Sequence, residues 1–173
     1  MRFFVLGLIM TLSTQLEAKN MIDYSDWTYL SDTVMGGVST GSARVVDSYQ
    51  GRAIRLKGNV STKNNGGFIQ VRAKVGRGAA KDLKGVRLLV KGNEDSYYVH
   101  LRVAGSFVPW HYYQQEFYAP NQWVELIMPF SSFERSSRIL RKDIDPAQIV
   151  TLGVVAYGKN YDAEIWIAKA EFY

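Results

Sequence analysis

Short runs in which apolar and polar residues alternate dominate the chain from residue 43 onward. A period of two places every second side chain on one face of a β-strand, whereas a helix repeats its apolar positions every three or four residues. The pattern predicts about nine or ten short strands. The clearest runs are 69–75, 97–103, 124–130, 150–156 and 164–173, and further candidates are 43–47, 52–60, 86–92 and 111–119.

Turn residues separate these runs. Asn65-Gly66 lies between two alternating segments and predicts a hairpin with a type I′ turn, because that turn needs positive φ at both central residues. Glycines close several other runs. Only 79–83 and 145–149 have a helical character, about one turn each. We therefore predict an all-β fold, an antiparallel β-sandwich of the jelly-roll type.

Residues 1–18 have the layout of a secretory signal peptide. Arg2 gives a positive start, residues 3–12 are mostly apolar, and a polar stretch ends at the small residue Ala18. The apolar run is too short for a transmembrane helix, which needs about 20 residues. We predict one folded domain over residues 19–173 without a membrane span, exported to the periplasm or secreted. An uncleaved anchor is the alternative.

Composition excludes several kinds of chemistry. The 173 residues include no cysteine, which rules out disulfides, thiolate metal ligands, iron–sulfur clusters and cysteine nucleophiles. The formal net charge is +5, but the basic residues are spread along the chain. Lysine and arginine on strand edges protect a sheet from unwanted pairing. We therefore predict no cofactor and no nucleic-acid partner.

Residues 37–41 (GVSTG) match the G-x-S-x-G pattern of a nucleophile elbow. That elbow requires a strand before the serine and a helix directly after it, yet Ser39 is followed by a predicted strand. The base would have to be His100 or His111, which both lie on predicted strands. We predict no catalytic residue, and we interpret Gly36-Gly37 as a bulge or a close approach of two backbone segments.

Other reactive groups are sparse. Two histidines without a suitably spaced carboxylate do not predict a metal site. Glu116, Glu125 and Glu164 lie on predicted strands and would form a glycosidase pair only if two of them shared a groove. Nothing in their spacing fixes their separation, so we predict surface or structural roles for them.

Aromatic residues make up 13% of the chain and are densest at 110–118. Because consecutive strand residues point to opposite faces, part of this cluster must face away from the core. Exposed aromatic rings beside amide and guanidinium groups suit a sugar or a peptide ligand. Large aromatics that close one end of the sandwich are the alternative. The ligand-binding candidates are Trp110, His111, Tyr112, Tyr113, Gln114 and Arg102.

Four segments of the chain are typical of one known family. They read DWTYLSDTVMGGVSTG, NVSTKNNGGFIQVR, QWVELIMPFSSFE and IVTLGVVAYG, in this order. In them the chain resembles the complex I intermediate-associated protein 30 family, over nearly all of its length from Trp27. The matching motif positions are Asp32, Thr33, Met35, Gly36, Gly37, Asn64, Asn65, Gly66, Gly67 and Phe68.

The resemblance implies a galactose-binding-like jelly roll without catalytic residues. Mitochondrial relatives act as chaperones in the assembly of respiratory complex I, and proteins of related fold bind carbohydrate. The resemblance therefore implies a non-catalytic binding module, an assembly factor or chaperone whose partner is a protein such as a membrane complex. An exported carbohydrate-binding module, whose partner is a glycan, is the alternative. For the motif positions it implies structural roles more than ligand contact.

Overall fold

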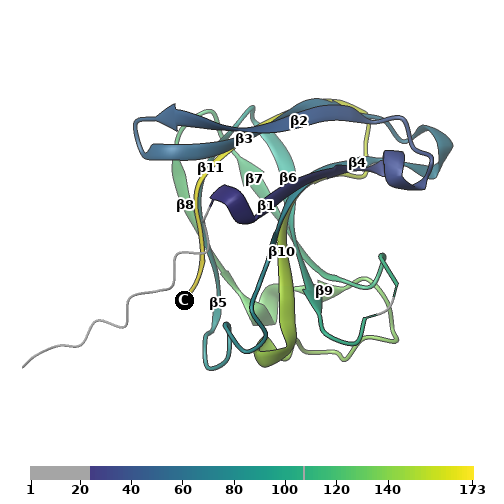
Figure 1. Cartoon of the computed structure of the whole chain (residues 1–173), viewed down its shortest axis with the longest axis vertical. Coiled ribbons are helices and arrows are strands. Elements are labelled where there is room, and N and C mark those ends of the chain that lie inside the picture. The colour runs from purple at the N-terminus through teal and green to yellow at the C-terminus, as the bar shows by residue number, and fades with distance from the viewer. Residues whose placement is uncertain (1–23, 107) are drawn as a thin grey trace, which may run out of the picture.

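The computed structural model describes residues 24–106 and 108–173, which form two antiparallel sheets packed face to face (Figure 1). The predicted signal peptide, residues 1–18, lies outside the described residues. The six-stranded sheet has the order β1 (Trp27–Ser31), β4 (Phe68–Lys74), β10 (Ile149–Tyr157), β6 (Asp95–Val103), β7 (Tyr113–Ala119) and β9 (Glu134–Arg135). The five-stranded sheet has the order β2 (Thr40–Ser48), β3 (Gly51–Val60), β11 (Tyr161–Phe172), β5 (Gly85–Gly92) and β8 (Val124–Pro129).

The predicted alternation places the core between the two sheets. On β4, Ile69 and Val71 are fully buried, while Gln70 between them is partly exposed. The core joins such aliphatic residues of the six-stranded sheet to those of the five-stranded sheet, for example Leu56 and Ile165. Each fully buried aliphatic side chain contributes about 1.5–3 kcal/mol. The all-β sandwich prediction is confirmed.

The predicted hairpin at Asn65-Gly66 is wrong. The strands before and after it, β3 and β4, belong to different sheets, so this segment crosses from one layer to the other. Asn64 and Asn65 have the positive φ values, 57° and 56°, whereas φ of Gly66 is −81°. The local dipeptide predicted a turn correctly but carried no information on which strands the turn connects.

The aromatic segment also differs from its prediction. The predicted strand 111–119 begins only at Tyr113, so Trp110, His111 and Tyr112 lie in the loop between β6 and β7. The strand-based expectation that His111 belongs to a strand is therefore wrong. Strand β7 begins to pair with β6 at Tyr113, which lies opposite Leu101.

Short 3-10 helices occupy several connections. The predicted turn at 145–149 contains η5 (Pro146–Gln148), capped by the Asp145 side chain. The predicted turn at 79–83 is a series of hydrogen-bonded turns rather than a helix. Another 3-10 helix, η3 (Lys63–Asn65), coincides with the turn predicted at Asn65. The sequence pattern had no counterpart for two strands, β1 and β9, or for the helices η1 (Tyr24–Asp26), η2 (Asp32–Met35) and η4 (Phe130–Ser132).

Candidate functional site

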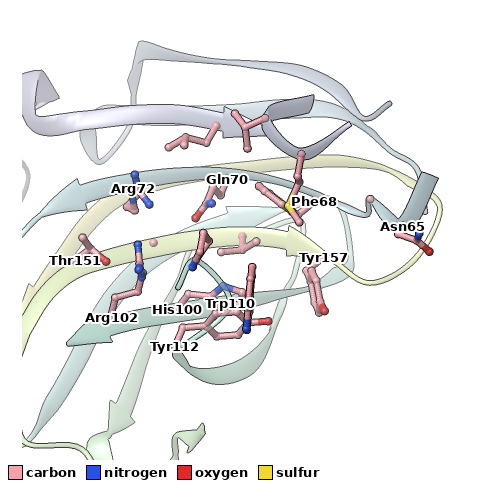
Figure 2. Close-up of a pocket in the computed structure, with 17 residues that line it drawn as sticks. Asn65, Phe68, Gln70, Arg72, His100, Arg102, Trp110, Tyr112, Thr151 and Tyr157 are labelled. Carbon is pink, nitrogen blue, oxygen red and sulfur yellow. The ribbon is translucent and has the colours of Figure 1, made fainter. Parts of the chain in front are cut away.

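The outer face of the six-stranded sheet carries a cleft of about 250 Å³ (Figure 2). Its floor consists of outward-facing residues of the three adjacent strands β4, β10 and β6. Gln70 and Arg72 on β4, like His100 and Arg102 on β6, alternate with fully buried aliphatic residues. The alternation that fills the core therefore gives the opposite face its amide, guanidinium and imidazole groups.

Gly153 deepens the floor of the cleft. The strand register places it between Arg72 of β4 and His100 of β6. A Cβ atom here would lie 3.1 Å from Gln70 Oε1 and 3.5 Å from the carbonyl oxygen of Val71. Because glycine has no side chain, the space between the two flanking strands stays open.

Two exposed apolar walls border this polar floor. One wall is η2, from which Val34 and Met35 line the cleft with 71% and 58% of their surface exposed. The other is the β6–β7 loop, from which Trp110 lines the cleft with 60% exposed. Side chains this apolar and this exposed mark a surface suited to a ligand.

A buried carboxylate holds the η2 wall in place. Asp32 is fully buried and accepts hydrogen bonds from the backbone N–H groups of Ser39 at 2.9 Å, Gly67 at 2.6 Å and Phe68 at 3.2 Å. It also accepts one from the Ser39 hydroxyl. One side chain thus ties the segment before β2 to the segment before β4.

Two glycines allow the backbone to surround this carboxylate. A Cβ on Gly37 would lie 2.3 Å from Asp32 Cγ, and a Cβ on Gly66 would lie 2.4 Å from Asp32 Oδ2. Gly36, beside them, has a φ of 88° and caps η2. Of the expected close approach at Gly36-Gly37, the structure shows the part at Gly37, whose Cα would lie 3.0 Å from a Cβ on Gly66, and both sequence motifs surround the same carboxylate.

The electrostatics of Asp32 follow from these contacts. Burial alone would raise its pKa, but the hydrogen bonds from Ser39, Gly67 and Phe68 outweigh burial and hold the pKa below its ordinary value. The carboxylate is therefore charged at neutral pH.

Ser39 is a structural residue in this arrangement. It is 1% exposed, its hydroxyl donates to Asp32, and the same oxygen accepts from the Ser61 N–H at 2.9 Å. Neither histidine forms a hydrogen bond with it in the described structure. A nucleophile must reach its substrate, so the G-x-S-x-G pattern here has a packing role.

The β6–β7 loop is fixed by polar contacts on both sides. Ser136 Oγ accepts from the Tyr112 N–H at 3.0 Å and donates to the Trp110 carbonyl at 2.6 Å. The Tyr112 ring stacks on His100, with ring centres 4.0 Å apart and planes at 12°. Arg102 Nη2 donates to carbonyl groups of the loop. The wall that carries Trp110 is therefore attached to the floor.

Burial controls the charges in the cleft. It lowers the pKa of His100 to about 3, so the imidazole is neutral at physiological pH. Burial, and next the Tyr157 hydroxyl, raise the pKa of Tyr112. Burial and the nearby charge of Arg72 lower the pKa of Arg102, but a guanidinium stays protonated in proteins.

Some polar atoms of the floor have no protein partner. His100 Nε2 and Arg102 Nε are buried without a hydrogen bond among the described residues. Buried polar groups are almost always paired in native proteins. These two atoms lie beneath the surface of the cleft floor, so the groups that the floor presents are the other polar atoms of its lining residues.

The six ligand-binding candidates separate into two groups. Trp110, Tyr112 and Arg102 line the cleft. Tyr113 faces the core and donates its hydroxyl to the Arg141 carbonyl at 2.9 Å. The remaining candidates lie outside the lining, Gln114 opposite His100 on β7 and His111 in the loop.

The family-motif positions also separate. Met35, Asn65, Gly66 and Phe68 line the cleft. The others lie in or beside its η2 wall. Asp32 accepts the hydrogen bonds described above, and Gly37 and Gly67 lie next to its carboxylate. Asn64 donates a hydrogen bond to the Gly36 carbonyl, and the hydroxyls of Thr33 and Ser31 share another.

Sequence reasoning missed much of the floor. Gln70, Arg72, Thr151 and Tyr157 line the cleft, and none was a candidate. Gln70, Arg72 and Thr151 are outward residues of predicted strands, which made them look like ordinary solvent-facing positions, and Tyr157 directly follows the predicted strand 150–156. The one available signal was the glycine of VTLGVVAYG, which interrupts the outward face of a strand.

The chemical groups of the cleft suit binding. No aspartate or glutamate is among its described lining residues, so it lacks the two carboxylates of glycoside hydrolysis. Glu116 lies on β7, whereas Glu125 and Glu164 lie on strands of the other sheet. Across residues 24–106 and 108–173, no group of three potential metal ligands occurs, and no helix there could span a bilayer.

Solved structures with the same fold include carbohydrate-binding modules. The family 11 module of the cellulosomal cellulase Lic26A-Cel5E of Clostridium thermocellum is 14% identical, has a TM-score of 0.70, and is matched over 90% of this chain and 92% of that chain. A Clostridium thermocellum family 11 module in complex with a β-1,3-1,4-mixed-linked tetrasaccharide is 15% identical, with a TM-score of 0.69 and coverages of 85% and 88%.

A second module type shares the fold. The family 30 module of the cellulosomal cellulase Cel9D-Cel44B of Clostridium thermocellum is 10% identical, with a TM-score of 0.60 and coverages of 86% and 91%. At these identities the similarity concerns the jelly-roll fold. No curated protein sequence matches the chain significantly.

The family assignment comes from the sequence. A family model described as Complex I intermediate-associated protein 30 (CIA30) matches residues 14–165. The match includes both motifs that surround Asp32, and it agrees with the resemblance found in the sequence. The chain belongs to the CIA30 family.

Proposed function

We propose that the protein is a non-catalytic binding module and that its cleft binds a glycan. The observation that carries this proposal is the pairing of exposed apolar walls, Trp110 and Met35, with a floor lined by amide and guanidinium side chains. A sugar ring has apolar C–H faces that stack on aromatic rings and a rim of hydroxyls that hydrogen-bond to amides and guanidinium groups. This arrangement offers both kinds of contact.

The related folds support the same proposal. One carbohydrate-binding module of this fold is in complex with a mixed-linked tetrasaccharide. The cleft here lies on one sheet face and is open enough to leave Tyr157 37% exposed at its border. An open cleft of this kind suits part of an oligosaccharide chain.

The experiment is a glycan screen followed by calorimetry on variants. We expect Trp110→Ala to weaken binding of the best oligosaccharide about tenfold or more, because it removes a stacking surface worth on the order of 1–2 kcal/mol. Tyr49→Ala is the matched control, since Tyr49 is fully exposed at 102% and lies in the β2–β3 turn. Absence of glycan binding, or equal affinity of Trp110→Ala and wild type, would refute the proposal.

Membership of the CIA30 family favours a second candidate function, a partner protein in the assembly of a membrane complex. Val34 and Met35 would then supply apolar contact area for the partner. Affinity purification of the tagged protein under mild crosslinking tests this function. Recovery of respiratory or other membrane-complex subunits by wild type, lost in a Met35→Asp variant, would support it. Recovery of no such subunits by the wild-type protein would contradict this second function.

Export remains a proposal based on residues 1–18. A reporter enzyme that is active only outside the cytoplasm, fused to Tyr173, should be active with the full chain and inactive when residues 1–18 are deleted. Activity without these residues, or inactivity with them, would contradict export.

A further inference from the structure

We propose that the glycan bound in the cleft is acidic, and that its carboxylate or sulfate group lies between Arg72 and Arg102. This inference rests on the proposed glycan-binding function and specifies the ligand class. Figure 2 shows the two arginines together at the end of the cleft near Thr151, away from Tyr157 and Asn65. Strand β10 lies between the two arginines, with Gly153 opposite Arg72 and Thr151 opposite Arg102.

Arg72 is a cation without an internal partner. It is partly buried on β4, and it makes no ion pair or hydrogen bond within the described residues. A guanidinium has five N–H donors and is always charged. Its donors are therefore free for a ligand in the cleft.

Arg102 is positioned but not neutralised. Its Nη2 donates to the carbonyls of Ser106 at 3.3 Å and Val108 at 3.2 Å, which fixes the side chain at the base of the loop. Its Nε is buried and has no partner among the described residues. Burial, and next the nearby charge of Arg72, lower the pKa of Arg102. The two cations therefore destabilise each other in the absence of an anion.

The contrast with other arginines shows that this pairing is unusual in the fold. Arg55 forms an ion pair with Glu164, and Arg87 pairs with Glu171 at 3.1 Å, although both arginine side chains are about one-third exposed. In the five-stranded sheet, partly buried arginines thus have a carboxylate partner. In the cleft, the two arginines have none.

The surroundings keep this end of the cleft positive. Lys74 lies one step along the same face of β4, opposite Thr151. The carboxylates on this face, Glu116 and Glu134, lie on β7 and β9, beyond His100, and neither forms an ion pair with the cleft arginines. His100 is neutral because burial lowers its pKa to about 3. A planar carboxylate or a sulfate would supply the missing negative charge.

The rest of the cleft indicates that the anion belongs to a sugar. A free inorganic anion would need only the arginines, but the lining also includes Trp110 and Met35, whose large exposed apolar surfaces contribute nothing to binding a small ion. A uronic acid or sulfated residue in an oligosaccharide would occupy both parts.

The experiment compares four probes by calorimetry: a uronic acid tetrasaccharide, a sulfated tetrasaccharide, the neutral β-1,3-1,4-mixed-linked tetrasaccharide, and sodium sulfate alone. We expect an acidic tetrasaccharide to bind at least tenfold more tightly than the neutral one, and to weaken as salt is added. Sulfate alone should bind far more weakly. Whichever acidic probe binds more tightly identifies the anion.

Arg72→Ala is the decisive variant, because it removes no hydrogen bond or ion pair within the described residues. It should weaken the acidic probe about tenfold or more and the neutral probe less than threefold. Arg138→Ala is the control with the same charge change, since Arg138 is exposed outside the cleft. Its affinities should equal those of wild type.

The outcomes separate this inference from the function on which it rests. Equal or tighter binding of the neutral probe would overturn the acidic ligand and leave glycan binding intact. Equal losses in Arg72→Ala and Arg138→Ala would likewise overturn the site between the two arginines. No binding of any oligosaccharide would overturn both proposals.

Discussion

Asp32 is the residue on which the geometry of the cleft wall depends most. Its two oxygens accept from three backbone N–H groups and one hydroxyl, and these donors come from both motifs characteristic of the family. Its burial would be costly without these partners. The DTVMGGVS and NNGGF motifs are therefore two halves of one structural unit.

Asp32→Asn tests this unit. An amide replaces one acceptor oxygen by a donor, so at least one buried N–H group loses its partner, at a cost of about 1–3 kcal/mol or somewhat more. We expect a lower urea midpoint at pH 7 with an unchanged m-value. A midpoint equal to that of wild type would contradict the role assigned to the carboxylate.

The pH dependence of wild type follows from the same residue. Since the folded pKa of Asp32 lies below the ordinary value of 3.8, ionised Asp32 stabilises the fold above that pH, and the contribution is lost as pH falls through the folded pKa. Urea unfolding at pH 7 and pH 3 should show a larger loss for wild type than for Asp32→Asn. Parallel losses would show that Asp32 does not contribute.

Gly66 is a second residue on which the cleft wall depends, because any side chain at this position would collide with Asp32. The hairpin interpretation gave it a positive φ, but its φ is −81°, so a β-carbon is excluded by contact with Asp32 Oδ2 and Gly37 rather than by backbone strain. We expect Gly66→Ala to lower the melting temperature by several degrees. Gly76→Ala, where a Cβ meets nothing within 4 Å, should leave it unchanged or raise it slightly. Equal melting temperatures for the two variants would refute the close approach.

At the level of elements, β10 organises the site. It lies between β4 and β6 and contributes the glycine that opens the floor. Gly153→Val should fill this space while keeping the strand, because valine favours strands and the nearest contact, Gln70 Oε1, is the end of a flexible side chain. We expect glycan affinity to fall more than tenfold with a far-ultraviolet circular dichroism spectrum like that of wild type. Unchanged affinity in the folded variant would place the ligand elsewhere.

The elements also show what the sequence could and could not predict. The period of two identified most strands, because burial of one face demands alternation. It did not predict β1, whose outward positions are not clearly polar, nor the two-residue β9. Arg72 and His100 meet across Gly153 only after β4, β10 and β6 pair. Such long-range pairing has no local signature, so the floor was missed while the conspicuous aromatic cluster supplied Trp110 and Tyr112.

For the whole molecule, the inner faces of the two sheets and their outer faces differ in the groups that they carry. The inner faces form the core, and the five-stranded sheet pairs its partly buried charges, as in Arg55 with Glu164. The outer face of the six-stranded sheet instead leaves Arg72 without a partner beside exposed aromatic and apolar residues. The proposed binding surface is therefore separate from the ion pairs of the other sheet in one jelly roll.

The most direct measurement is an amide chemical-shift titration of the folded protein with the tightest-binding tetrasaccharide. Glycan binding in the cleft predicts saturable shifts concentrated at Gln70, Arg72, Arg102, Trp110 and Gly153, with little change on β2, β3 and β11. Shifts centred on the five-stranded sheet, or no shifts with any tetrasaccharide, would contradict it.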